Sequence, residues 1–244
     1  MYRSILYEKK DRIARLTLNR PEVRNAVNET MRQEIILALA DAKADGDIAV
    51  VVVSASGKSF CSGRDRNEFM NHDGWSMAEV YSDYARGKEF LDVLQYYPKP
   101  LIAAVQGFAL GYGVSIVTYC DLAVAGQSAV FGYPEINENI IPATAAVKAA
   151  ETVGRRMLTE MIFLGNRYTA DQALAMGLIN CVTKDEDILP KAAEWAETMA
   201  KNDPTTNQLC KQFIQSVGKT GYDAGALNSV SVLSVSYANN KKWR

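Results

Sequence analysis

The stretch from Ala103 to Glu135, AAVQGFALGYGVSIVTYCDLAVAGQSAVFGYPE, decides the fold of this chain. An apolar run at 101–105 is typical of a buried strand, and a second apolar run follows at 122–125. Three glycines separate these runs and precede a helix-like segment: Gly107, Gly111 and Gly113. Glycine lets the backbone approach a ligand closely, and the amides at the start of a helix can bind negative charge. A plain strand-to-helix turn explains such an isolated motif equally well.

A second segment of the chain has the same organisation. Residues 48–54 (IAVVVVS) are typical of a buried strand, which runs into a glycine-containing turn at 57–65 (GKSFCSGRD). Two strands that each end in a glycine turn could direct two backbone N–H groups at one carbonyl oxygen. This is the requirement of an oxyanion hole.

Further segments share their order and spacing with a known family. They are NRPEVRNA at 19–26, FCSGRD at 60–65, PKPLIAAVQG at 98–107, GYG at 111–113, CDLA at 120–123, FGYPEI at 131–136, YTA at 168–170 and AMGLIN at 175–180. Together they resemble the enoyl-CoA hydratase/isomerase, or crotonase, superfamily over nearly the whole chain. The resemblance implies an α/β fold, a crotonase-like spiral of β-β-α units with a helical C-terminal region. It also implies a core over 1–187, a trimerisation region over 188–244, and a C-terminus slightly shorter than is usual in the family.

Periodicity and turn residues predict the other elements. A hairpin of strands at 4–9 and 13–18 is expected, then a helix that Asn28 caps and Gly46 ends. Further helices are expected at 77–97, 143–153, 155–164, 169–176, 188–201, 204–217 and 222–237, and a short strand at 179–182. Strands alternating with helices, followed by helices alone, indicate an α/β protein. The tyrosines at 81, 84, 96 and 97 are expected to pack in the core.

Composition excludes several classes of function. The net charge of −1 gives no sign of nucleic-acid binding, and no apolar run is long enough to span a bilayer. The N-terminus lacks a signal-peptide pattern, and the four cysteines form no CxxC pair, so a reduced, cytoplasmic protein is predicted. With His72 as the one histidine, a Cys/His zinc site is not expected, and no metal is predicted.

The resemblance assigns roles to individual residues. In the family, two backbone amides hold the thioester oxygen of an acyl-CoA, and the matching residues here are Arg64 and Tyr112. The Arg64 side chain is expected in solvent or on a CoA phosphate. The resemblance implies substrate contacts at Arg24, Ser62, Gly63, Asp65, Phe69 and Gly111. The rest of the acyl pocket is expected from residues 65–97.

The acid–base position departs from the pattern of a hydratase. A typical hydratase has two catalytic glutamates; the second matches Glu135, while the first falls on Ser115. A single carboxylate can move a proton between two carbons, and burial can raise its pKa to suit. Ser115 is a second candidate catalytic residue, although a small helix residue bonded to the backbone is the plainer interpretation. Glu138 is expected to be solvated or structural, and Cys61 to be a packing residue.

The favoured function is isomerase-type proton transfer on an unsaturated acyl-CoA, in fatty acid metabolism, with slow hydration of simple 2-enoyl thioesters. Two alternatives use Glu135 with Ser115: an enoyl-CoA hydratase, or a hydratase-lyase like the hydroxycinnamoyl-CoA enzymes, in which a tyrosine stands at the position of Phe69. A non-catalytic acyl-CoA-binding protein and a generic α/β domain are alternatives of another kind. No cofactor is predicted beyond the coenzyme A of the substrate, and the resemblance implies a homotrimer or a dimer of trimers.

Overall fold

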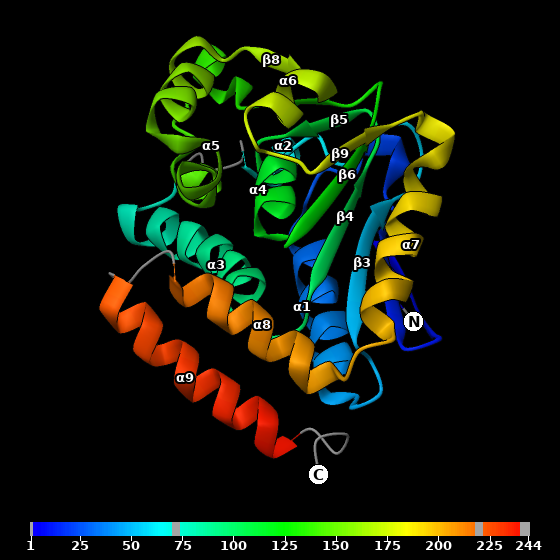
Figure 1. Cartoon of the computed structure of the whole chain (residues 1–244). Coiled ribbons are helices and arrows are strands. Elements are labelled where there is room, and N and C mark those ends of the chain that lie inside the picture. Colours follow the sequence, from blue (N-terminus) through cyan, green and yellow to red (C-terminus); the bar gives the residue numbers. More distant parts are fainter. Residues whose placement is uncertain (1, 70–73, 218–221, 240–244) are drawn as a thin grey trace.

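A sheet with the strand order β1-β2-β3-β4-β6-β9 lies at the centre of the fold (Figure 1). The structure is a computed structural model that describes residues 2–69, 74–217 and 222–239. The strands of this sheet are β1 (Ile5–Lys10), β2 (Ile13–Leu18), β3 (Val50–Ala55), β4 (Leu101–Val105), β6 (Leu122–Gly126) and β9 (Cys181–Thr183). The hairpin of β1 and β2 is antiparallel and the other pairings are parallel, as in an α/β protein.

The two strands predicted to lead into glycine turns are neighbours. β3 pairs with β4, and Val51 lies opposite Leu101. Because parallel strands end at the same edge of a sheet, the turns that follow β3 and β4 meet there.

A smaller sheet lies beyond that edge, and the sequence did not predict it. It consists of β5 (Phe108–Leu110), β7 (Val130–Gly132) and β8 (Arg167–Thr169), with β7 in the middle. A strand of three residues is too short to show alternation, and its place depends on partners far away in the chain.

The helices agree closely with the sequence pattern. They are α1 (Glu29–Ala44), α2 (Arg66–Phe69), α3 (Met77–Gln95), α4 (Tyr112–Tyr119), α5 (Ala143–Leu164), α6 (Ala170–Ala175), α7 (Ile188–Ala200), α8 (Pro204–Val217) and α9 (Tyr222–Asn239), with short 3-10 turns η1 (Pro21–Val23), η2 (Pro134–Glu138) and η3 (Asp185–Asp187). As predicted, Asn28 caps α1 by accepting the amide of Met31 at 2.9 Å. Gly154, with φ of 75°, breaks the helical path within α5, so the predicted division there is confirmed.

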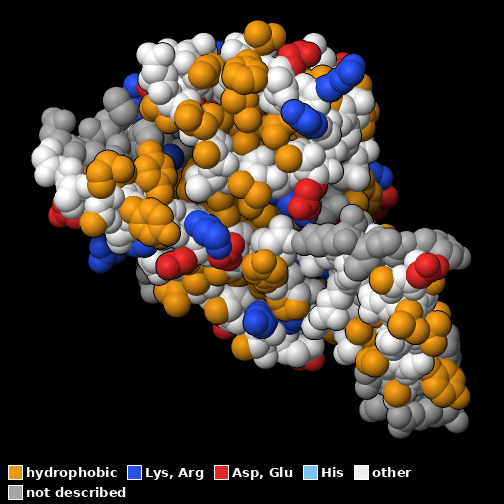
Figure 2. All heavy atoms as spheres, turned by 90° about the vertical axis from the view of Figure 1, so that its left-hand side faces the viewer, with side chains coloured by type: hydrophobic (Ala, Val, Ile, Leu, Met, Phe, Trp, Pro, Cys, Tyr) orange, Lys and Arg blue, Asp and Glu red, His pale blue; other side chains and the backbone are white. Residues whose placement is uncertain are grey.

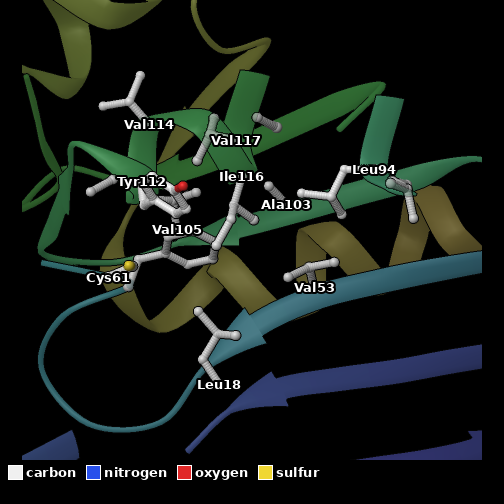
Figure 3. Packing of buried hydrophobic residues seen from close by; sticks show 14 of the residues in the cluster. Leu18, Val53, Cys61, Leu94, Ala103, Val105, Tyr112, Val114, Ile116 and Val117 are labelled. Atoms are coloured by element: carbon white, nitrogen blue, oxygen red, sulfur yellow. The ribbon is translucent and has the colours of Figure 1, made fainter. Parts of the chain in front are cut away.

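Both faces of the large sheet are covered. Val51 and Val53 of β3 pack into the larger core with α1, α3 and α4, part of which is shown in Figure 3. Val50 and Val52 point the other way, into a second cluster with the apolar face of α7. The predicted boundary between a core over 1–187 and a trimerisation region over 188–244 stays a prediction. Helix α7 lies beyond this boundary, and its buried residues belong to the core.

The tyrosines around α3 do not form the predicted core cluster. Tyr97 is buried, but Tyr81, Tyr84 and Tyr96 are 77%, 38% and 74% exposed. Their spacing fits more than one face of a helix, so the packed face could not be identified from tyrosines alone.

Of the two last helices, α8 is bonded to the rest of the fold and α9 packs on α8. The ammonium of Lys211 on α8 is buried, donates to the carbonyl of Lys99 at 3.1 Å and pairs with Asp121 at 2.8 Å. Helix α9 packs on α8, and Figure 2 shows hydrophobic side chains on the projecting lower lobe where α9 lies. Among the described residues, no helix combines the length and the apolar character that crossing a membrane requires.

The exposed apolar residues of α9 lead to a prediction about assembly. Leu227, Val230 and Leu233 are 73%, 61% and 62% exposed, a pattern typical of a surface that another chain covers. We expect the protein to form a trimer or a dimer of trimers, and light scattering at micromolar concentration measures this. A double Val230→Asp/Leu233→Asp variant should lower the molar mass, whereas Leu6→Asp, on a 55% exposed residue of β1, serves as the control. A strict monomer in the parent protein would contradict the prediction.

Candidate active site

Three extended segments run side by side into one site. Cys61 forms a parallel bridge with Ala109 of β5, and β5 pairs in parallel with β7, which leads to Glu135. Arg64 and Tyr112 each lie three residues beyond that bridge, so their turns begin in register. Cys61 itself is fully buried, and burial raises the pKa of its thiol to about 12, which agrees with the packing role predicted for it.

The backbone amides of Arg64 and Tyr112 belong to the two turns that meet at this site. Tyr112 is the first residue of α4, where an amide has no acceptor inside the helix. Arg64 lies in a parallel bridge with Val27 that uses the carbonyl of Gly63 and the amide of Asp65. In such a bridge the amide of the middle residue points to the opposite side of the strand. Both residues line the same cavity.

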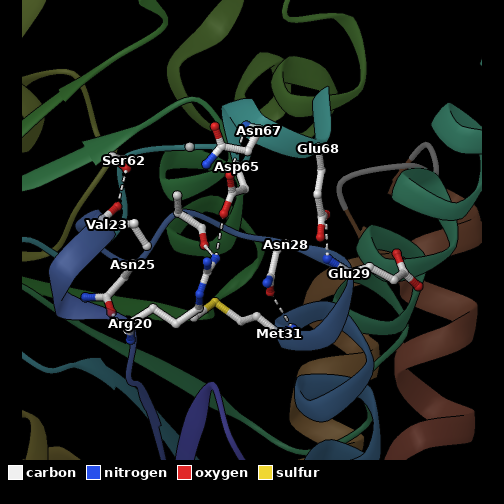
Figure 4. Close-up of polar contacts among 12 residues, drawn as sticks. Arg20, Val23, Asn25, Asn28, Glu29, Met31, Ser62, Asp65, Asn67 and Glu68 are labelled. Carbon is white, nitrogen blue, oxygen red and sulfur yellow. Dashed lines mark hydrogen bonds and ion pairs between the residues drawn. The ribbon is translucent and has the colours of Figure 1, made fainter. Parts of the chain in front are cut away.

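A buried polar network holds the turn that carries Arg64 (Figure 4). Arg20 donates to the carboxylate of Asp65 at 2.8 Å, and Asn25 donates to the carbonyls of Ser56 and Ser59 at 2.9 and 2.8 Å. The resemblance implied a substrate contact for Asp65, but the side chain lies under the turn, does not line the cavity and is ion-paired with Arg20. Its position makes it a support for the turn.

The carboxylate of Glu135 lies directly against the other turn. A methyl group built on Gly111 would be 2.3 Å from Oε1 of Glu135, so only glycine leaves room for the carboxylate there. Oε2 is buried and has no hydrogen-bond partner among the described residues. Burial raises the pKa of Glu135 to about 6, and the charge of Glu138 adds to this effect. A carboxyl with that pKa can both accept and return a proton near neutral pH.

Ser115 lies one helical turn behind Gly111 and is fully buried. Its hydroxyl donates to the carbonyl of Ala145 at 2.8 Å and lies 3.3 Å from the carbonyl of Gly111. Ser115 does not line the cavity, so its geometry agrees with the plainer interpretation, a helix residue bonded to the backbone. We therefore assign it no part in proton transfer.

The cavity in front of Glu135 has a volume of about 200 Å³. Its walls are formed by Ser62, Gly63, Arg64, Arg66, Tyr84, Gly111, Tyr112, Pro134, Glu135, Glu138, Ile140, Ile141, Pro142, Thr144 and Ala145. Among the described residues, the segment from 134 to 145 supplies more of these walls than the segment from 65 to 97, which was expected to line the acyl pocket and contributes Arg66 and Tyr84. The apolar residues Ile140 and Ile141, just before the helix predicted from residue 143, were the available signal in the sequence.

An ion pair crosses the rim of the cavity. The guanidinium of Arg66 on α2 makes two bonds of 2.8 Å to the carboxylate of Glu138 on η2. The pair joins the segment after Arg64 to the segment that carries Glu135. Glu138 is exposed, as expected, but its partner is 72 positions away and no local pattern could have indicated it.

The Arg64 side chain is not in solvent, and this expectation was wrong. Its guanidinium pairs with Asp83 of α3, and the two side chains are 13% and 7% exposed. It also lies 5.6 Å from the ring centre of Tyr84, a cavity residue of the same helix.

The other residues predicted to contact the substrate either lie around the entrance of the cavity or fall outside the described residues. Ser62, Gly63 and Gly111 line the cavity, while Arg24 is exposed beside it and accepts the amide of Ser62 through its carbonyl. The Phe69 side chain and all of His72 lie outside the described residues.

Comparison with known proteins identifies relatives across this whole arrangement. The sequence model of the enoyl-CoA hydratase/isomerase family matches residues 8–232. The chain is 33% identical over 222 residues to the 2,3-dehydroadipyl-CoA hydratase of Escherichia coli, covering 91% of this chain and 85% of that protein. It is 32% identical over 218 residues to the short-chain-enoyl-CoA hydratase of Clostridium acetobutylicum, covering 86% and 80%.

Solved structures give the same result for the fold. The enoyl-CoA hydratase of Mycobacterium smegmatis superposes with a TM-score of 0.92 and 27% sequence identity, over 97% of this chain and 92% of that one. Enoyl-CoA hydratase subunit I of Geobacillus kaustophilus superposes with a TM-score of 0.90 and 26% identity, over 98% and 91%.

Proposed function

Since this chain belongs to the enoyl-CoA hydratase/isomerase family, whose enzymes act on acyl-CoA, we propose that it moves a proton within an unsaturated acyl-CoA thioester. Glu135 is the sole catalytic carboxylate in this proposal, and the amides of Arg64 and Tyr112 form the oxyanion hole. The isomerase-type reaction, from a 3-enoyl to a 2-enoyl thioester, is favoured.

The proposed reaction needs two proton transfers and no water. The carboxylate of Glu135 takes a proton from C2 of the 3-enoyl thioester, and the electron pair moves into the carbonyl to give a dienolate. The two amides stabilise the negative oxygen, because preorganised donors need no rearrangement as the charge develops. The protonated Glu135 then returns the proton to C4, and the double bond moves to C2–C3. Carboxylate and amides suffice for these steps, so no separate cofactor is required.

The observation that carries this proposal is the position of the Glu135 carboxylate against Gly111, between the two turns that bear the amides. Ser115, at the position where a hydratase would have its other glutamate, is buried and bonded to the backbone. Water addition has to orient and deprotonate a water while another group gives a proton to carbon, and two carboxylates divide that work well. A 1,3-proton shift has no such need.

The coenzyme A moiety is proposed to leave the cavity past Ser62. Outside that turn, the guanidinium groups of Arg24 and Arg167 lie 5.9 and 5.3 Å from the ring centre of Phe108. Both arginines are exposed, so this part of the surface presents two cations that can pair with phosphate groups.

Hydration is the second candidate, and the names of the relatives favour it. Both curated relatives described above are hydratases, one for a 2,3-dehydroadipyl thioester and one for short-chain enoyl thioesters. For this chain to hydrate such substrates, Glu135 would have to perform both proton transfers in sequence.

A comparison of the two reactions distinguishes these candidates. We expect the parent protein to isomerise a 3-enoyl thioester faster than it hydrates the matched 2-enoyl thioester. The variant Ser115→Glu should raise hydration, because helix side chains point back toward the N-terminus and Gly111 lies one turn earlier, beside Glu135. Like-charge repulsion would then raise the pKa of the pair, so the gain should be larger at higher pH.

The control for this experiment is Ser115→Ala, which removes the hydroxyl without adding a carboxylate. Both rates are measured with each protein by mass spectrometry of the products. Rapid hydration by the parent protein would contradict the isomerase preference in favour of a single-glutamate hydratase. Tight binding of saturated and unsaturated acyl-CoA esters with no turnover of any would instead indicate a non-catalytic binding protein.

A further inference from the structure

Both residues of the proposed oxyanion hole have long side chains, although only their amides take part in it. The guanidinium of Arg64 extends to α3, where it pairs with Asp83 and lies 5.6 Å from the ring centre of Tyr84. Both members of the ion pair are at least five-sixths buried. A buried pair of this kind is strongly disrupted when one partner is removed, because the other charge is left without compensation.

The Tyr112 side chain extends to the same helix. Its ring lies parallel to the ring of Phe90, at 6.3 Å between centres and an angle of 5°. Its hydroxyl lies against Gly87, because a methyl group built on Gly87 would be 2.4 Å from that oxygen. Tyr112 is 6% exposed, so its side chain is buried against this helix.

Three of the four contact positions on α3 lie on a single face of the helix. Asp83, Gly87 and Phe90 are spaced by four and three residues, which is the spacing of neighbours along one side of an α-helix. Asp83 and Gly87 are buried and Phe90 is 1% exposed, so this face is the one packed against the body. The two turns of the site therefore share α3 as a support, in addition to the sheets that lead into them.

The carboxylate of Asp83 has more than one cation around it. Arg86 lies 3.2 Å from Oδ1, and the buried guanidinium of Arg32 on α1 is close enough to act on it through charge. Burial alone would raise the pKa of Asp83, but the bond and charge of Arg64, with the charges of Arg32 and Arg86, lower it below its ordinary value. Asp83 is therefore ionised and can hold Arg64 throughout the neutral pH range.

We propose that α3 positions the oxyanion hole: Asp83 fixes the amide of Arg64 through the Arg64 side chain, and Gly87 with Phe90 fixes the amide of Tyr112 through its ring. This inference rests on the function proposed above. Its physical basis is that oxyanion donors act at about 2.7–3.1 Å from the developing charge, so a small displacement of either turn weakens them. Asp83 is a positioning residue, since it does not line the cavity.

The test is the variant Asp83→Asn, which keeps the shape of the side chain and removes its charge. We expect kcat to fall by about tenfold to a hundredfold, less than the loss of a whole donor, with a smaller change in KM. The inflection of the pH profile that Glu135 causes should stay in place. A saturated acyl-CoA bound to the parent protein should show its thioester carbonyl stretch at lower frequency than in water, and the variant should lose part of that shift.

Two further variants keep the test decisive. Asp92→Asn removes the carboxylate of an exposed pair with Lys88 on the same helix and should leave kcat and the carbonyl frequency unchanged. If Asp83→Asn does not fold, the double variant Arg64→Met/Asp83→Leu removes both buried charges without leaving either one unpaired. It keeps a backbone amide at residue 64 but loses the ion pair that fixes this amide, so it should show the same loss.

The outcomes separate this inference from the proposed function. A folded Asp83→Asn or double variant with the kcat and carbonyl shift of the parent would overturn the role of α3 and leave the proposed function intact. A parent protein that shows no carbonyl shift with any bound acyl-CoA would overturn both. Loss of kcat with an unchanged carbonyl frequency would show that Asp83 acts elsewhere than at the oxyanion hole.

Discussion

Replacing Glu135 by glutamine is expected to lower turnover of an unsaturated acyl-CoA by about two to four orders of magnitude, the usual contribution of a general acid–base group. Glutamine keeps the size of the side chain but cannot take up the proton. Binding of a saturated acyl-CoA should be nearly unchanged, because the oxyanion amides and the cavity walls remain. The measurement is kcat together with the dissociation constant of a saturated thioester. Near-normal turnover would remove Glu135 from the mechanism.

The pH dependence gives the same experiment a second readout. Burial raises the pKa of Glu135 from its ordinary value of 4.5 to about 6. Because the reaction starts from the carboxylate, kcat/KM of the parent should rise with pH through about 6 and level off above it. The residual activity of Glu135→Gln should lack this inflection.

The stability of Glu135→Gln is the control for unfolding, and the direction of its difference from the parent protein can be derived. A carboxyl whose pKa is raised in the folded state binds its proton more tightly there, so stability falls as pH rises from the unfolded pKa to the folded one. Above pH 6 the buried charge of Glu135 should cost about 1–2 kcal/mol. The glutamine variant should therefore be more stable than the parent at pH 8 and similar to it at pH 4. A destabilised variant at pH 8 would show that its lost activity has a structural cause.

Gly111→Ala is expected to have the largest combined effect on activity and stability. Gly111 has φ of 52° and ψ of −113°, a conformation that residues with a Cβ rarely adopt, and forcing it costs about 1–3 kcal/mol. The added methyl group would also lie 2.3 Å from Oε1 and 3.3 Å from Cδ of Glu135. The carboxylate must move, and displacement by about 1 Å can cost about 10²-fold in rate. Denaturant unfolding and kcat measure the two effects.

Gly46→Ala is the matched control for this variant. Gly46 follows α1, lies outside the left-handed region, and has no heavy atom within 4 Å of a built Cβ. Its replacement should leave activity unchanged and stability the same or slightly higher, because alanine restricts the unfolded chain. A Gly111→Ala protein with parental activity would show that Glu135 tolerates a different position, which would weaken the assignment of its carboxylate as the base.

The sequence was sufficient to predict the frame of the site. Long apolar runs predicted β3 and β4, and the glycines after them predicted two turns at one edge of the sheet. The choice of the backbone amides of Arg64 and Tyr112 followed from the resemblance. These features are local in the sequence. A short continuous apolar run indicates a buried strand, and glycines with positive φ occur where the backbone must turn sharply. The position of Glu135 beside the turns followed from the resemblance.

The side chains around that frame could not be predicted, because their partners are far away in the sequence. The pairing of Arg66 with Glu138 and of Arg64 with Asp83 depends on how α2, α3 and η2 meet. The hydroxyl of Ser115 donates to the carbonyl of Ala145 in α5, thirty residues further along the chain. Local propensity contains no information about such contacts, and the three-residue strands of the small sheet were missed for the same reason.

The parallel pairing of β6 with β9 has a consequence for synthesis of the protein. Val124 pairs with Cys181, so a nascent chain leaves the ribosome with β6 at an open edge until more than fifty further residues have been added. The same delay leaves the sheet face that α7 covers, with Ile102 and Val124, in contact with water. Open edges and apolar faces promote aggregation, and parallel pairing over long distances is slow. Released chains that are truncated before Cys181 should therefore bind chaperones more strongly than the released 244-residue chain.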